Sequence, residues 1–277
     1  VKSLPGAVFE VRAAEDIYTL DGVMHYAKGE IVDTITTGSD GVASSKELYL
    51  GKYEIQEITA PHGMVLNGTI QTVELTYAGQ EVAITETAGN LYNERQNVKV
   101  SLSKVLEQNE LFGIGMNGEL KNITFGLYAK TDLVAGDGTI IPAGGLIEIV
   151  TFDDNGMATV SADLPLGSYY LQERSTDEHY ILDDTHYEFE FSYGSQETHM
   201  VEISVNGGDP IKNDLKYGMV SGRKIDEDGH VIAGAIFGLF RNDENEYTAE
   251  NAYLTAESAQ DGTFKFEKVP FGTWIVR

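Results

Sequence analysis

Short runs of alternating apolar and polar residues dominate the chain, and one such run recurs. It is clearest after Gly167, where Tyr169, Leu171 and Glu173 occupy every second position. Alternate residues of a β-strand lie on one face of its sheet, so two apolar members predict that this face is buried. The third member is a carboxylate in an apolar core, which is costly unless it is protonated or paired. The run therefore predicts an inward-facing acid.

The same run is found at two further places. In the first copy Tyr53, Ile55 and Glu57 take the inward positions. A third copy begins at Phe271 and reaches Arg277, one residue before its expected glutamate. An inward acid in both complete copies indicates a role that the repeats share.

Other features recur around this run in the same order. Each copy opens on a short strand with a phenylalanine, at residues 4–11, 120–128 and 232–240. A variable stretch and a glycine-containing turn follow, and the turns, typical of β-hairpins, are at 39–41, 154–156 and 260–262. The complete copies continue through strands at 71–76 and 187–192 and end on short asparagine-bearing strands at 91–94 and 211–214.

No stretch has a convincing helical period. Short strands between regular Gly, Asn and Asp turns predict an all-β protein made of tandem β-sandwiches. We expect a first domain at residues 1–96 that lacks its first strand, a complete second domain at 97–215, and the N-terminal part of a third at 216–277. The linkers are very short, so the domains are expected to lie end to end, in a chain that belongs to a larger protein.

Composition narrows the possible partners. The formal net charge of −25 argues against binding nucleic acid or an anionic membrane surface, because both would repel the chain. The absence of cysteine excludes disulfides and thiolate metal sites, and no apolar run is long enough to span a bilayer.

The six histidines show no metal-binding spacing, and residues 153–156 fit a hairpin turn better than a calcium loop. We expect neither a metal nor a cofactor.

The second domain places three polar side chains on inward faces. Lys104 continues an apolar face of the first strand, Glu173 lies in a middle strand, and Asn213 shares a face with Ile211 in the last strand. Each has an ordinary interpretation: the lysine head can extend to water, the glutamate can pair with an arginine, and the asparagine can belong to a turn. Their occurrence in order within one repeat favours a joint role.

The residues that identify the family are the strings LPGAVF at 4–9, YEIQEITAPHG at 53–63 and YLQE at 170–173, with Asn93 and Asn213. On these residues essentially the whole chain resembles tandem Cna protein B-type domains, also called SpaA-type pilin domains, of Gram-positive surface proteins. The resemblance implies prealbumin-like or Ig-like β-sandwiches. It also implies an intramolecular isopeptide bond between Lys104 and Asn213, promoted by the buried acid Glu173.

Elementary chemistry agrees with that role. A lysine amine is a nucleophile only when neutral, and burial lowers the pKa of an amine. Burial also favours the neutral form of a carboxyl group, so an inward Glu173 is expected to be protonated. It can then donate to the Asn213 carboxamide and carry a proton from Lys104 to the departing ammonia. Each domain would react once, which is maturation and not enzymatic turnover.

The incomplete domains contain parts of the same set. In the first domain Glu57 and Asn93 match, but Lys2 is too close to the next strand to be the partner, so we expect no such bond there. In the third domain Lys224 is the candidate lysine, and its acid and asparagine are expected beyond Arg277. We therefore expect Lys224 to be unreacted.

Three functions remain open at this stage. The first is a stalk segment of a cell-wall-anchored adhesin or pilus protein, outside the cell. The second is a surface module that binds a host matrix protein or a glycan, with the variable segments 14–29 and 130–145 as its loops. The third is an accessory domain of a secreted enzyme, and nothing in the sequence indicates a catalytic site with turnover.

Overall fold

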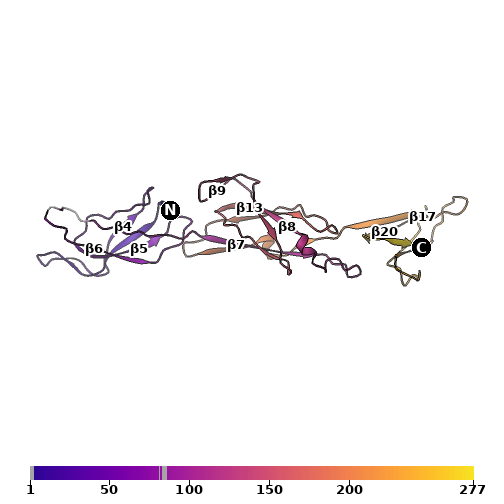
Figure 1. Cartoon of the computed structure of the whole chain (residues 1–277), viewed down its shortest axis with the longest axis horizontal. Coiled ribbons are helices and arrows are strands. Elements are labelled where there is room, and N and C mark those ends of the chain that lie inside the picture. The colour runs from indigo at the N-terminus through magenta and orange to yellow at the C-terminus, as the bar shows by residue number, and fades with distance from the viewer. Residues whose placement is uncertain (1–2, 81, 83–85) are drawn as a thin grey trace.

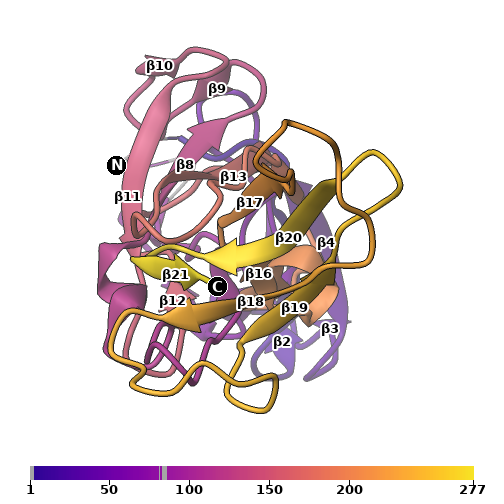
Figure 2. The ribbon, with the colours of Figure 1, turned by 90° about the vertical axis from the view of Figure 1, so that its right-hand side faces the viewer.

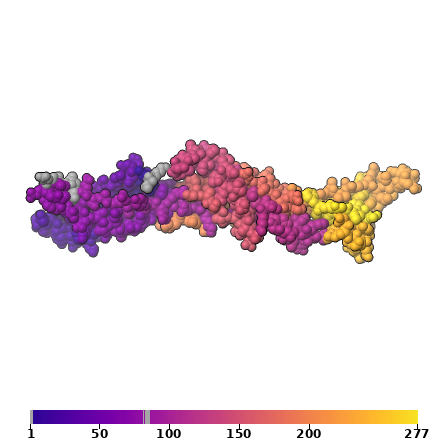
Figure 3. Space-filling view, viewed as in Figure 1, coloured from indigo at the N-terminus to yellow at the C-terminus, as the bar shows by residue number. Residues whose placement is uncertain are grey.

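The computed structural model describes residues 3–80, 82 and 86–277. Its sheets form three groups that follow one another along an elongated molecule (Figure 1, Figure 3). We call these groups the first, second and third units. The helical segments of the described residues are two short 3-10 helices, η1 (Glu119–Asn122) and η2 (Val205–Gly208). The predicted all-β class is therefore confirmed, and no helix in the described ranges is long and apolar enough to cross a membrane.

The first unit is built on one antiparallel sheet in the order β4-β1-β5-β6. Its strands are β1 (Val8–Ala13), β4 (Ile31–Thr36), β5 (Gly51–Thr59) and β6 (Ile70–Leu75). In β1 Phe9, Val11 and Ala13 are buried because they alternate with polar residues, which places all three on the inner face. The variable segment 14–29 forms a small hairpin of β2 (Ile17–Tyr18) and β3 (Met24–Tyr26).

The second unit contains two facing sheets. One has the order β11-β8-β13-β14, from β8 (Thr124–Ala129), β11 (Leu146–Thr151), β13 (Gly167–Ser175) and β14 (Tyr187–Phe191). The other has the order β12-β7-β15 with β16 also paired to β7, from β7 (Asn97–Leu106), β12 (Met157–Thr159), β15 (Met200–Ser204) and β16 (Ile211–Asn213). The strand β7 is antiparallel to β12 and parallel to β15 and β16, so it is the centre of this sheet. Segment 130–145 holds a hairpin of β9 (Leu133–Val134) and β10 (Ile140–Ile141).

The third unit repeats part of this arrangement (Figure 2). A two-stranded sheet pairs β17 (Tyr217–Arg223) with β20 (Thr263–Pro270). A second sheet has the order β19-β18-β21, from β18 (Ile236–Arg241), β19 (Leu254–Glu257) and β21 (Trp274–Val276). Its core is small and centres on Leu239, Phe266 and Val269.

The recurring run has the same local structure in each unit. The hydroxyl of Tyr169 donates to the carbonyl of Pro165, and the hydroxyl of Tyr53 donates to the carbonyl of Tyr49. In the third unit Trp274 stands at this position and its indole N–H donates to a carbonyl four residues back, at 2.9 Å. The repeat therefore preserves a hydrogen bond even where the residue type changes.

The two complete runs begin with a glycine for a steric reason. A Cβ at Gly167 would lie 2.3 Å from the Leu133 side chain, and a Cβ at Gly51 would lie 2.4 Å from that of Ile17. Both glycines also have positive φ, at 158° and 149°. Any other residue at either position would bring its Cβ too close to that neighbouring side chain and would also strain the backbone, because positive φ is unfavourable for residues with a Cβ.

The three predicted hairpin turns are present, with glycines 41, 156 and 262 all at positive φ. The strand predicted at 91–94 is not present, whereas the corresponding β16 is paired in parallel with β7. A β-strand forms when its backbone N–H and C=O groups make hydrogen bonds to a neighbouring strand. The described residues of the first unit place no equivalent of β7 beside residues 91–94.

Direct contacts join neighbouring units. Between the first and second, the Leu66 N–H donates to the Gln196 carbonyl at 2.8 Å, and the Gln196 side chain accepts from the Ala60 N–H at 2.9 Å. Between the second and third, Glu107 of the second unit accepts from the Tyr217 hydroxyl of the third at 2.9 Å. These contacts fix each junction, in agreement with the predicted end-to-end arrangement. The exact domain boundaries remain predictions.

Candidate functional site

The three inward polar residues of the second unit come from three different strands. Lys104 lies near the end of β7, Glu173 near the end of β13 and Asn213 at the end of β16. The parallel pairing of Ile211 with Lys104 aligns β16 with this part of β7 and sets the register that brings Asn213 close. All three residues are buried, with exposed fractions of 1%, 3% and 1% in the order given.

Their side chains meet in one cluster. The Lys104 Nζ donates to the Asn213 Oδ1. The Asn213 Nδ2 lies 3.0 Å from each carboxylate oxygen of Glu173, and the Lys104 Nζ lies 3.4 Å from Glu173 Oε1. Each member therefore contacts the other two, and the lysine does not extend to water.

Three further residues complete the surroundings. The Thr176 Oγ1 accepts a hydrogen bond from Asn213 Nδ2 at 2.9 Å, and the Asp183 N–H donates to Glu173 Oε2 at 2.7 Å. The Phe125 ring centroid lies 5.5 Å from the Lys104 Nζ. No sequence pattern marks Thr176 or Asp183, because both follow a strand in segments without alternating apolar and polar residues. The Phe125 ring therefore borders the amine, and the Asp183 N–H holds one oxygen of the carboxylate.

Burial also changes the chemistry of the amine. Removal from water lowers the pKa of Lys104, because burial disfavours the ammonium form, while the nearby Glu173 opposes this effect. A lower pKa increases the fraction of neutral amine, which is the nucleophilic form. The cluster thus combines a nucleophile, a carboxamide carbon and a carboxyl group that contacts both.

The first unit contains two members of this set. Glu57 is 2% exposed, and its Oε2 accepts from the Asn93 side chain at 2.6 Å and from the Asn67 N–H at 2.7 Å. The Asn67 contact corresponds to that of Asp183 in the second unit. Asn93 is only half-buried. Lys2, which the sequence analysis rejected as the partner, lies outside the described residues.

The third unit contains only the lysine. Lys224 is half-buried, and its Nζ donates to the backbone carbonyl of Ile225 at 3.3 Å. That it stays unreacted remains a prediction.

Other polar clusters have structural roles. Asp153 Oδ1 accepts from the Asn155 and Met157 N–H groups, so residues 153–156 form the expected hairpin turn. Asp226, Asp228 and His230 have ligand-type atoms within 4.8 Å of one another. Asp226 already caps its own turn, accepting from the backbone N–H groups of the other two.

Comparison with known proteins agrees with this architecture. The model of the SpaA family, described as a prealbumin-like fold domain, matches residues 1–88, 114–206 and 218–277. No curated protein sequence matches the chain.

Three solved structures that match the chain have the following TM-scores. The Bacillus anthracis TIE protein has a TM-score of 0.61 at 20% identity, over 100% of this chain and 42% of that chain, so the chain spans less than half of its length. The major pilin subunit of Bacillus cereus has a TM-score of 0.33 at 16% identity, over 99% of this chain and 83% of that chain. A streptococcal ancillary pilin has a TM-score of 0.31 at 18% identity, over 100% and 84%. The chain belongs to the family of SpaA prealbumin-like fold domains, which it contains in tandem.

Proposed function

We propose that the second unit cross-links itself through an amide between Lys104 and Asn213. The neutral Nζ attacks the Asn213 Cγ and a C–N bond forms. The Cγ–Nδ2 bond breaks, and Nδ2 leaves as ammonia. Glu173, whose carboxyl oxygens lie beside Asn213 Nδ2 and the Lys104 Nζ, gives its proton to the departing nitrogen and takes one from the amine. One ammonia is lost, and no other reactant is needed.

The observation that carries this proposal is the closed contact among the three buried side chains. Reacting groups that a fold holds together reach effective concentrations of about 10⁵–10⁸ M. The acid touches both the amine that must lose a proton and the nitrogen that must gain one. The reaction occurs once for each unit, so we propose maturation of a structural protein and no enzymatic turnover.

The cross-link would change how the unit responds to force. It joins the first strand, β7, to the last, β16, so a pull on the two ends passes through covalent bonds and bypasses most of the sandwich. It would also close a loop across the 109 positions from Lys104 to Asn213. This gives a chain without cysteine a covalent means of stabilisation.

We therefore propose that the chain is a stalk segment of a Gram-positive surface protein, either an adhesin or a pilus subunit, outside the cell. Membership of the SpaA family supports this function, as do the serial units with hydrogen bonds at both junctions. The proposed partners are the neighbouring domains of the same surface protein. A host matrix protein or a glycan remains an alternative partner.

Single-molecule stretching tests the stalk function. If the bond forms, the second unit should not extend between its cross-linked strands. The Lys104→Met variant should unfold with an extra length of roughly 360–390 Å, from 109 residues at the extended spacing of the chain. The matched control is Lys212→Met, which replaces an exposed lysine next to Asn213 and should behave as the wild type. Equal extension of the wild type and Lys104→Met would contradict the proposal.

A further inference from the structure

The segment between β7 and η1, residues 107–118, is longer than its counterpart in the third unit. In the second unit 21 positions separate Lys104 from Phe125 in β8, whereas in the third unit 13 positions separate Lys224 from Phe237 in β18. The second unit therefore carries additional residues here, and the segment begins at Glu107, which bonds the third unit.

The additional residues form a small hairpin with Phe112 in its turn. The backbone N–H groups of Asn109 and Ile114 each donate to the other residue's carbonyl, at 3.0 and 3.1 Å. The Glu119 carboxylate accepts from the Gly115 N–H, just after the hairpin, at 2.9 Å. These hydrogen bonds hold the turn in place, although the segment belongs to neither sheet of the second unit.

The Phe112 ring lies among three side chains of the third unit. Its centroid is 5.5 Å from that of Trp274 and 6.4 Å from that of Tyr253, and both pairs are edge-to-face. The guanidinium carbon of Arg241 lies 5.6 Å from the Phe112 centroid. Edge-to-face aromatic pairs and a cation over a ring are both attractive. Figure 3 shows this purple-to-magenta part of the chain against the orange and yellow third unit.

The side chains around Phe112 differ from those at the same place in the other units. Arg241 and Trp274 form a cross-strand pair between β18 and β21. The other two units have a buried alanine and a buried tyrosine at this pair, Ala13 with Tyr53 and Ala129 with Tyr169. The third unit thus presents a cation and a larger aromatic ring at the point where the second unit reaches it.

The third unit also lacks the side chain that covers this pair in the other units. Four residues after the alanine stands a buried aliphatic residue, Ile17 or Leu133, which packs in the same core as the pair and against the glycine that begins the run. The equivalent residue of the third unit is Asn245, which is exposed. Among the described residues, a Cβ at Gly272 would meet only the Trp274 Nε1 within 4 Å, at 3.8 Å. The hairpin of the third unit therefore leaves this place open.

We propose that residues 107–118 are a docking loop with which the second unit covers the core of the third, Phe112 taking the place of the missing aliphatic side chain. Trp274 and Tyr253 pack against the core of the third unit, so Phe112 extends that core across the junction. The partner that the loop fits is a unit with arginine and tryptophan at the cross-strand pair. A unit with the alanine–tyrosine pair has its own cover there and leaves no place for Phe112. The loop therefore selects which unit can follow the second.

The full chain provides its own probe, because Trp274 is its one tryptophan. We expect Phe112→Ala to shift the Trp274 emission to longer wavelength and to increase its quenching by acrylamide, since the indole loses its cover. Phe112→Tyr keeps the ring and should stay close to the wild type. Leu111→Ala shortens the neighbouring side chain of the same turn, which is 44% exposed, and should have no effect.

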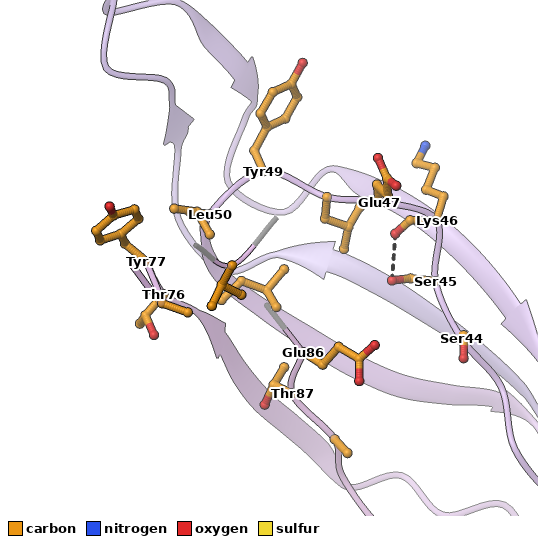
Figure 4. A pocket seen from close by; sticks show the side chains of 15 residues that line it. Ser44, Ser45, Lys46, Glu47, Tyr49, Leu50, Thr76, Tyr77, Glu86 and Thr87 are labelled. Carbon is orange, nitrogen blue, oxygen red and sulfur yellow. Dashed lines mark hydrogen bonds between the residues drawn. The ribbon is translucent and has the colours of Figure 1, made fainter. Parts of the chain in front are cut away.

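A second control removes an aromatic ring elsewhere. Tyr77 is 68% exposed and borders a groove of about 850 Å³, opposite Tyr49 and Leu50 (Figure 4). All residues that line this groove belong to the first unit. Tyr77→Ala should therefore leave the Trp274 emission unchanged.

Hydrogen–deuterium exchange of the same variants locates the effect. In Phe112→Ala we expect faster exchange in β18 and β21, with β8 and β13 as in the wild type. Unchanged Trp274 emission and quenching in Phe112→Ala, or equal changes in Leu111→Ala, would overturn the docking loop. Faster exchange in β8 and β13 as well would also overturn it, because Phe112 would then serve the fold of its own unit. None of these readouts depends on the cross-link between Lys104 and Asn213.

Discussion

Lys104 and Asn213 lie 109 positions apart in sequence, yet their side chains form a buried hydrogen bond that links the first strand of the second unit to its last. The parallel pairing of β16 with the end of β7 makes this possible. The contact places the amine next to the carboxamide that it would attack. This contact is the basis for the amide bond that we propose, and it explains why that bond would join the first strand of the unit to its last.

The acid should be required for the cross-link. Glu173 contacts both reacting groups, and removal of its carboxyl group leaves no side chain in the cluster that can move the proton. We expect the intact mass of Glu173→Ala to equal the mass calculated from its sequence, whereas the wild type should be lighter than its calculated mass by one ammonia. Glu57→Ala removes the equivalent acid of the first unit and is the matched control, in which the second unit should still react. Loss of ammonia in Glu173→Ala would rule out the assigned role.

The cross-link should contribute measurably to stability. Closing a loop of this length is worth about 5 kcal/mol in the chain-entropy treatment of cross-links. We expect Lys104→Met to lower the free energy of unfolding of the second unit by this order, measured by chemical denaturation. Lys212→Met replaces a lysine whose side chain is 55% exposed and should change little. A Lys104→Met variant as stable as the wild type would argue against a bond in the folded protein.

The turn before β12 should also affect the reaction. Gly156 has a φ of 74°, and a Cβ there would lie 2.1 Å from the Lys104 carbonyl oxygen. Gly156→Ala must therefore displace the backbone that carries the amine, and we expect slower cross-linking and lower stability. Gly138→Ala is matched, because its φ is 90° but nothing lies within 4 Å of its Cβ position. Similar cross-linking rates in the two variants would show that the position of the β7 backbone does not matter.

The buried amine should make an unreacted unit sensitive to pH. The pKa of Lys104 is lowered by burial in the folded state, whereas an unfolded lysine titrates near about 10.4. Between these values the unfolded chain holds more protons, so the free energy of unfolding should rise with pH in that window and be flat below it.

This effect can be isolated by comparing Asn213→Ala, which cannot react, with the double variant Lys104→Met/Asn213→Ala. The stability of the lysine-containing protein relative to the double variant should increase as the pH approaches about 10.4. A difference that stays constant or falls with rising pH would mean that burial does not lower the pKa of Lys104 in the folded state.

The sequence predicted the members of the site because period-two patterns reveal which face a residue occupies. Lys104, Glu173 and Asn213 each continue an apolar face, and all three are buried. Thr176 and Asp183 could not be found this way, since their roles depend on where the chain passes after a strand ends. The parallel pairing of β15 with β7 also leaves no local signal, because it joins residues about a hundred positions apart.

The prediction of a strand at 91–94 was wrong for a related reason. Its residues have the same pattern as β16, but a strand forms only where a neighbour offers its backbone groups. Gln196 and Glu107, which connect the units, were also missed, because surface polar residues look alike in sequence whether or not another unit lies against them.

The cross-link between Lys104 and Asn213 is tested most simply by the intact mass of the purified chain, followed by peptide mapping. We predict a mass lower than that of the sequence by one ammonia, and a branched peptide that joins Lys104 to Asn213. The deficit should be absent in Lys104→Arg, which keeps a cation at the site but no reactive amine. A wild-type chain of full mass, with Lys104 and Asn213 recovered in separate peptides, would contradict the account.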